Sequence, residues 1–266
     1  MLDILFNPQK AQRHPIEIIF IGIFYSSLSV FLGSWIFESS RSISIIFLTV
    51  ISCLYVVQGA IRAEEKKERG HIEEERLLRE HRGTIYLILF LFIGFTISFT
   101  LWAFFFPQYT ALKVFRSQKV SVEKIRMITG NAVSANTLAK IFLNNVKVVA
   151  VSLIFALAYG AGAIYILVWN ASVMGYVIGT IAKGKFGFAA IPFVMFKYLL
   201  HGIPEMLAYI VAAFAGGILY FAFIRGDLVK KEKIKKITID TAILLLISFA
   251  LLAISAVIEV YVSSLI

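Results

Sequence analysis

Residues 84–106 read TIYLILFLFIGFTISFTLWAFFF, an unbroken run without a charged side chain. A helix of this length crosses a hydrocarbon core of about 30 Å. Other apolar runs repeat the pattern, and we expect further spans at 16–37, 43–61, 146–169, 186–201, 204–224 and 239–263. The run 171–182 is too short to cross and is expected to form a re-entrant or half helix. The sequence therefore predicts an all-α, polytopic transmembrane helix bundle of about seven spans.

The composition of the chain agrees with this interpretation. Hydrophobic residues make up 59% of the 266 residues and charged residues only 16%, whereas soluble domains carry about 25% charged residues. The single cysteine, Cys53, excludes an intrachain disulfide. No Walker A motif, GxGxxG sequence or zinc-ligand spacing is present, so we expect neither a cofactor nor a metal ion.

The distribution of basic residues predicts the orientation of the chain. Loops rich in Lys and Arg stay in the cytoplasm. With a cytoplasmic N-terminus and an outer C-terminus, 17 Lys and Arg residues lie inside, among them Lys183 and Lys185, and 8 lie outside. Such loops, with anionic lipid as their partner, account for the net charge of +10 without nucleic acid. We therefore expect a multi-pass protein of the cell membrane.

Two parts of the chain are expected from its charge pattern. Residues 1–83 are predicted to form a helix pair with a charged cytoplasmic helical hairpin, because the charges at 65 and 69 and at 75 and 79 have the favourable helical order. Residues 84–266 are predicted to form the transmembrane core. This core includes an outer basic amphipathic segment, 107–145, which either lies in the membrane interface or binds a partner.

Ionisable residues within the apolar bulk mark a candidate site. The segment 198–205 reads YLLHGIPE and follows Lys197, so that a lysine, His201 and Glu205 lie close together. Such side chains cost roughly 2.5–3.5 kcal/mol each at membrane depth and usually serve a function. A contact of Glu205 with either of the other two would offset the cost of burial. Glu259, late in the last span, is expected near the outer interface.

Two further sets of residues complete the candidate site. Gly202 and Pro204 predict a helix break, with one helix ending near Leu200 and the next beginning at the proline. Asn145 and Asn170 either satisfy free backbone groups and bond across helices or line a hydrophilic groove with the ionisable residues.

Small residues at four-residue spacing predict close helix packing, either within the chain or in a homo-oligomer. The glycines in these pairs are Gly160, Gly162, Gly175, Gly179, Gly216 and Gly217.

Residues 142–217 contain a recognisable series of short motifs: FLNN at 142–145, VWNA at 168–171, MG at 174–175, HG at 201–202, Glu205, and the small residues at 213, 216 and 217. This series resembles the stage II sporulation protein M family. The family has an Asn-Asn helix start, an Asn-Gly element and a His-Gly-x-x-Glu motif. The chain departs from it at Ala171, in the glycine position, and at Leu200, where the family commonly has proline. Weaker similarity extends over 84–263.

The resemblance implies a function as well as a fold. A member of the family acts in spore engulfment as a membrane scaffold for peptidoglycan-degrading partners. We therefore expect a non-enzymatic scaffold or assembly factor that contacts lipids and other membrane or envelope proteins through its hairpin or its outer amphipathic segment. The alternative is a transporter or channel whose ionisable centre is Lys197, His201 and Glu205. An enzyme is not expected, because the possible acid–base pair, His201 and Glu205, has no nucleophile or metal-ligand set in recognisable spacing.

Overall fold

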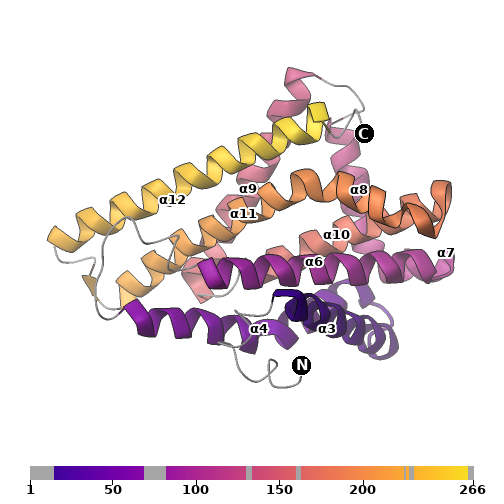
Figure 1. Cartoon of the computed structure of the whole chain (residues 1–266), viewed down its shortest axis with the longest axis horizontal. Helices are drawn as coiled ribbons and strands as arrows, with labels where there is room; N and C mark the ends of the chain where they lie inside the picture. The colour runs from indigo at the N-terminus through magenta and orange to yellow at the C-terminus, as the bar shows by residue number, and fades with distance from the viewer. Residues whose placement is uncertain are drawn as a thin grey trace. The chain divides into compact units, whose positions relative to one another are not determined.

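The computed structural model describes residues 15–68, 82–129, 134–159, 163–224, 226–227 and 231–262, and in these ranges all regular structure is helical (Figure 1). Seven of its helices are long and apolar enough to cross a membrane, which confirms the predicted fold class. They are α3 (Pro15–Ile36), α4 (Arg41–Glu68), α6 (Arg82–Phe105), α9 (Ala135–Tyr159), α10 (Ala163–Ile181), α11 (Ile191–Ile224) and α12 (Lys231–Val257). Two shorter helices, α7 (Gln108–Val114) and α8 (Arg116–Thr129), lie between α6 and α9.

The boundaries of the spans differ from the prediction in two places. Because α9 ends at Tyr159 and α10 begins at Ala163, the predicted span 146–169 is divided between two helices. The segment 171–182, predicted as a half helix, lies in a full-length candidate span, Ile164–Gly184. Conversely, α11 runs through Gly202 and Pro204 without interruption, so the predicted helix break is wrong and the spans 186–201 and 204–224 are one helix.

The chain divides into two compact units. The first comprises Met1–Ile125 and Leu167–Phe196, and the second comprises Arg126–Ile166 and Lys197–Ile266. This division does not follow the predicted boundary between residues 83 and 84. The side chains of the predicted charged hairpin, including both of its i,i+4 pairs, lie outside the described residues, as do Gly160 and Gly162.

In the first unit, α3 and α6 approach closely at two glycines. A methyl group on Gly22 would lie 3.0 Å from the Leu91 carbonyl oxygen, and one on Gly94 would meet the Ile19 carbonyl oxygen. The hydroxyls of Ser27 (α3) and Ser98 (α6) lie 2.9 Å apart across this contact. At these glycines the backbones of α3 and α6 pack directly against each other, as expected where small residues face one another in a membrane.

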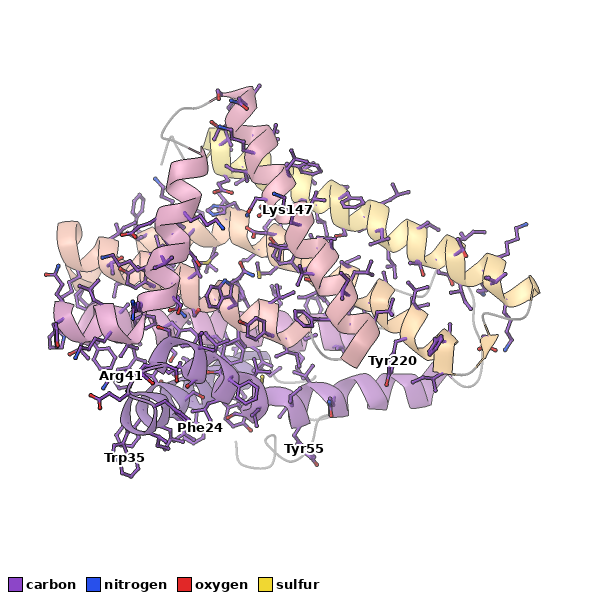
Figure 2. The ribbon with its side chains drawn as sticks, turned by 180° about the vertical axis from the view of Figure 1, so that it is seen from behind. Phe24, Trp35, Arg41, Tyr55, Lys147 and Tyr220 are labelled. Carbon is purple, nitrogen blue, oxygen red and sulfur yellow. The ribbon has the colours of Figure 1, made fainter. Side chains whose placement is uncertain are left out.

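The outer surface of the first unit is apolar. Phe24, Trp35 and Tyr55 project away from α3 and α4 (Figure 2) and are 56%, 75% and 62% exposed. Exposed side chains of this kind match a lipid environment, with aromatic rings enriched at the membrane interfaces.

In the second unit, hydrogen bonds fix the register of α11 and α12. Ser255 Oγ donates to the His201 carbonyl oxygen at 2.8 Å, and Ser248 Oγ donates to the Ala208 carbonyl oxygen at 2.9 Å. Seven residues forward along α11 thus correspond to seven residues backward along α12, so the two helices are antiparallel, as Figure 1 shows.

The third helix of this unit, α9, packs against both of them. Ile141 contacts Ala256 and Val260 near the C-terminal end of α12. Further along α9, the Leu153 backbone approaches Gly216 of α11. Because Ala256 is next to Ser255, which bonds to His201, Ile141 of α9 lies at the level of His201 of α11. Leu153 lies later in α9 and Gly216 later in α11, so the two helices run parallel.

Candidate functional site

Pro204 lies inside α11, and a neighbouring helix supplies a hydrogen bond at this point. Proline has no N–H, so the Leu200 carbonyl loses its usual partner in the helix. The next carbonyl, that of His201, accepts the hydrogen bond from Ser255 of α12. Serine side chains of neighbouring membrane helices commonly satisfy backbone groups near a proline. The helix continues through Pro204, so that His201 and Glu205 lie on one uninterrupted helix.

Glu205 is partnered by a tyrosine one helical turn later. The Tyr209 hydroxyl donates a hydrogen bond to Glu205 Oε1 at 2.7 Å. Tyr209 is buried and Glu205 is half-buried. Both lie inside the candidate span Phe188–Ile224, so this carboxyl group lies within a membrane-spanning segment.

A second carboxyl group, that of Glu259, approaches the first from α12. It interacts electrostatically with both Glu205 and Tyr209. The direction of helical side chains explains this, because they tilt toward the N-terminus of their own helix. The Glu205 side chain therefore leans toward the level of His201, and the Glu259 side chain leans toward the level of Ser255. Because Ser255 and His201 lie opposite one another, the two carboxyl groups lean toward the same level. Glu259 is half-buried and late in its span. We call Glu205, Tyr209, Glu259, His201 and Ser255 together the polar cluster.

His201 is buried, and its ring lies 5.8 Å from that of Tyr198 at an angle of 59°. Lys197, one turn earlier, leans by the same rule toward the start of α11 and away from Glu205. In the part of the chain that the structure describes, Lys197 forms no ion pair, and the hydrogen-bond partner of Glu205 is Tyr209. Of the two partners considered for Glu205 in the sequence, Lys197 is therefore not the one that the structure pairs with it; the hydrogen bond comes from Tyr209.

The two predicted asparagines belong to different units. Asn145 is buried in α9, one turn after Ile141, and accepts a 3.5 Å hydrogen bond from Asn144 Nδ2. Because α9 runs parallel to α11, Asn145 lies near the depth of Glu205. Lys147, two residues on, is exposed (Figure 2). Asn170 is in α10, in the first unit. The second unit thus contains four of the five predicted polar residues.

The glycines with described surroundings differ in their packing. Methyl groups on Gly175 and Gly179 would come within 2.6 Å of Phe99 Cβ and within 2.5 Å of the Thr100 carbonyl oxygen. Gly216 is equally close to α9. At Gly217 no described atom lies within 4 Å of such a methyl group, so this residue does not pack closely against another helix within the described chain.

Three residues of the cluster had no predicted functional role: Tyr209, Ser255 and Glu259. A signal for Tyr209 exists in its four-residue distance from Glu205. Ser248 and Ser255 are seven residues apart in the apolar part of α12, which places them on one face. Glu259 lies in a π-helical turn, Ile258–Val262, that continues α12. Such turns are rare in proteins, and those that occur are often found at functional sites.

Replacing Ser255 with alanine is expected to destabilise the α11–α12 contact. The change removes the hydrogen bond to the His201 carbonyl, which lies next to the carbonyl freed by Pro204. Side-chain hydrogen bonds between membrane helices contribute about 0.6 kcal/mol on average and up to about 1.7 kcal/mol. Thermal unfolding in detergent, followed by circular dichroism, measures the loss. Ser255→Thr keeps the hydroxyl and should be close to wild type, and equal stability of the alanine variant would contradict the assigned bond.

Together, the helices and their internal polar cluster define a multi-pass, all-helical membrane protein with ionisable residues inside its spans. The stage II sporulation protein M family matches residues 84–264. The match covers more than half of the chain, so the protein belongs to this family, which confirms the resemblance seen in the sequence. The first two spans, α3 and α4, precede the matched region. No curated protein and no solved structure matches the chain.

Proposed function

We propose that the protein is a non-enzymatic transport protein that moves protons, or solutes coupled to protons, with Glu205 and Glu259 as the proton-binding groups. The observation that carries the proposal is the approach of these two carboxyl groups from antiparallel helices within candidate spans. Intramembrane carboxyl groups are costly, and where they occur they commonly belong to ion pathways and proton relays. A site with only a structural role would be less costly with apolar side chains.

The chemistry of the cluster supports the same proposal. Two interacting carboxyl groups take up and release protons as a pair. The Tyr209 hydroxyl supports Glu205 through its hydrogen bond. His201 lies one helical turn before Glu205 on the same helix and is buried. A proton could therefore pass between Glu205 and Glu259 without leaving the second unit.

The orientation we propose is a cytoplasmic N-terminus and an outer C-terminus in the cell membrane. Because α10 is a full-length candidate span, this orientation assigns Lys183 and Lys185 to the outer side rather than to the inner side. The inner side then has 15 Lys and Arg residues and the outer side 8, without Lys140 and Lys147, which lie in the candidate span Ala135–Leu157. The inner excess is smaller than predicted from the sequence, but it still favours the same orientation.

Proton flux into liposomes tests this proposal. Purified protein is reconstituted, a potassium diffusion potential is applied, and internal pH is followed with a trapped dye. Wild-type protein should acidify the lumen well above the rate of empty liposomes, and Glu205→Gln should reduce the rate at least about tenfold while remaining folded. Glu38→Gln is the matched control, because the Glu38 side chain is 88% exposed and lies outside the spans.

Two outcomes would reject the proposal at different levels. Wild-type flux equal to that of empty liposomes would reject proton transport. Wild-type flux that survives in Glu205→Gln would keep transport but reject this site.

A scaffold or assembly role for partner proteins is the second candidate, and family membership is the observation that favours it. Deletion of residues 64–80, most of the charged linker, separates the two functions. A scaffold that binds partners there should lose them in affinity purification from membranes. A transport protein should keep its flux, because the deleted residues lie outside the candidate spans.

A further inference from the structure

Helices α7 and α8 form a nearly continuous element on the first unit. Backbone hydrogen bonds of 2.9 Å run from Phe115 N to the Ala111 oxygen and from Lys119 N to the Phe115 oxygen, across the junction of the two helices. Helical spacing therefore persists from residue 108 to residue 125, within the first unit. Its side chains can be sorted into one face that packs on the unit and one that does not.

The inner face of this element is fixed to three spans. Phe115 is fully buried and meets Phe99 of α6 edge-on, with 6.3 Å between ring centroids and an angle of 89°. Gln118 Nε2 donates to Ser172 Oγ of α10 at 3.1 Å. Ser42 Oγ of α4 donates to the Val114 carbonyl oxygen at 2.8 Å. The element is therefore held rigidly, with a defined outward side.

The outward side is a stripe of exposed basic and apolar residues, which we call the outer stripe. Its members are Tyr109, Lys113, Arg116, Val120 and Lys124. Their spacing of three or four residues places them on one helical face. Lys113 Nζ lies 4.3 Å from the centre of the Tyr109 ring. Glu123, the carboxylate beside the stripe, is paired with Lys119 at 3.7 Å, so the stripe as a whole is positively charged.

The ends of the neighbouring spans place the outer stripe at the membrane surface. Helix α6 ends at Phe105, which is 63% exposed, and α7 begins three residues later. Lys183 Nζ donates to the Phe106 carbonyl oxygen, so a cation from the end of α10 binds the end of α6. Since the end of a span lies at the interface, an element fixed beside it lies among the lipid headgroups.

We propose that the outer stripe binds the phosphate groups of anionic phospholipids. Lys113, Arg116 and Lys124 supply the charge, and Tyr109 and Val120 contact the upper acyl chains, as in interfacial amphipathic helices. A bilayer fits better than a soluble protein partner, because Phe105, at the end of the span directly before α7, is exposed and apolar as well. The inference stands on the first unit alone and does not depend on the proposed transport function.

Lipid titration of the purified full chain tests the inference. Short-chain phosphatidylglycerol and phosphatidylcholine are titrated into the protein in uncharged detergent, and binding is followed by native mass spectrometry and by the shift in melting temperature. Wild-type protein should bind phosphatidylglycerol at least about fivefold more tightly than phosphatidylcholine, with a preference that weakens as salt is added. The triple variant Lys113→Gln, Arg116→Gln, Lys124→Gln should lose most of this preference.

A charge-matched control separates the outer stripe from the net charge. The triple variant Lys140→Gln, Lys147→Gln, Lys235→Gln removes three exposed cations outside the stripe and should keep the preference. Melting temperatures in lipid-free detergent show whether each variant is folded; if the stripe triple variant is unfolded, the single variant Arg116→Gln replaces it and should lose part of the preference. Unchanged preference in folded stripe variants would overturn the inference. Unchanged preference together with loss of a co-purifying protein would assign the stripe to a protein partner and overturn it equally.

Discussion

A leucine at position 216 is expected to force α9 and α11 apart and to lower the melting temperature of the protein sharply. Even a methyl group on Gly216 would lie 2.7 Å from the Leu153 carbonyl oxygen and 2.8 Å from Ala156 Cβ. The first of these atoms belongs to the α9 backbone, so no side-chain rotation relieves the contact. Overpacking of a well-packed site typically costs about 1–3 kcal/mol, and here a whole helix must move. Thermal unfolding in detergent, followed by the far-UV circular dichroism signal of the helices, measures the effect.

The adjacent glycine provides the control. Gly217→Leu adds the same side chain to the same helix, at a position with no described atom within 4 Å of the added Cβ. Its melting temperature should stay near that of wild type, because substitutions away from tight contacts usually change stability by less than about 0.5 kcal/mol. Equal destabilisation by the two leucines would show that α9 does not pack on α11 at this glycine.

The second large effect is expected in a double-mutant cycle of the two carboxyl groups. Glu205→Gln and Glu259→Gln should each reduce proton flux at least about tenfold, and the double variant should be no slower than the slower single variant. Groups that act as one unit lose their function once either is removed, so the effects of their variants do not multiply. The liposome assay with the trapped dye measures all four proteins under one applied potential.

Tyr209→Phe completes this cycle as a matched control. It keeps both carboxyl groups and removes only the hydroxyl that donates to Glu205 Oε1. Its flux should fall less than that of either glutamine variant, because the proton-binding groups remain. Reductions that multiply in the double glutamine variant would show that Glu205 and Glu259 act independently and would contradict a shared proton.

The sequence alone predicts the helical fold because each span is a local property. Twenty apolar residues must be helical in a bilayer, whichever helix they pack against. The two errors in span boundaries have different origins. Pro204 was expected to end a helix, but Ser255 of another helix supplies a hydrogen bond beside it. The run 171–182 looked too short because the residues before it were assigned to the preceding span.

The candidate site is less predictable because it depends on register between helices. His201 and Glu205 are visible as ionisable residues in an apolar run, and Tyr209 follows at helical spacing. Nothing local, however, places Glu259 near Glu205, since 54 residues separate them. That proximity follows from Ser255 lying opposite His201 in antiparallel helices. The same limit applies to Gly216 and Gly217, which are alike in sequence and differ only in what faces them.

The π-helical turn at Ile258–Val262 has a consequence for how this family can vary in length. Such a turn holds one residue more than an α-helical turn, and insertion of a single residue into an α-helix is a simple way to produce it. Loss of one residue just before Glu259 would restore regular winding and rotate the following side chains by roughly 100° about the helix axis. Relatives that differ here by one residue would then keep the membrane helix but turn this carboxyl group toward a different neighbour.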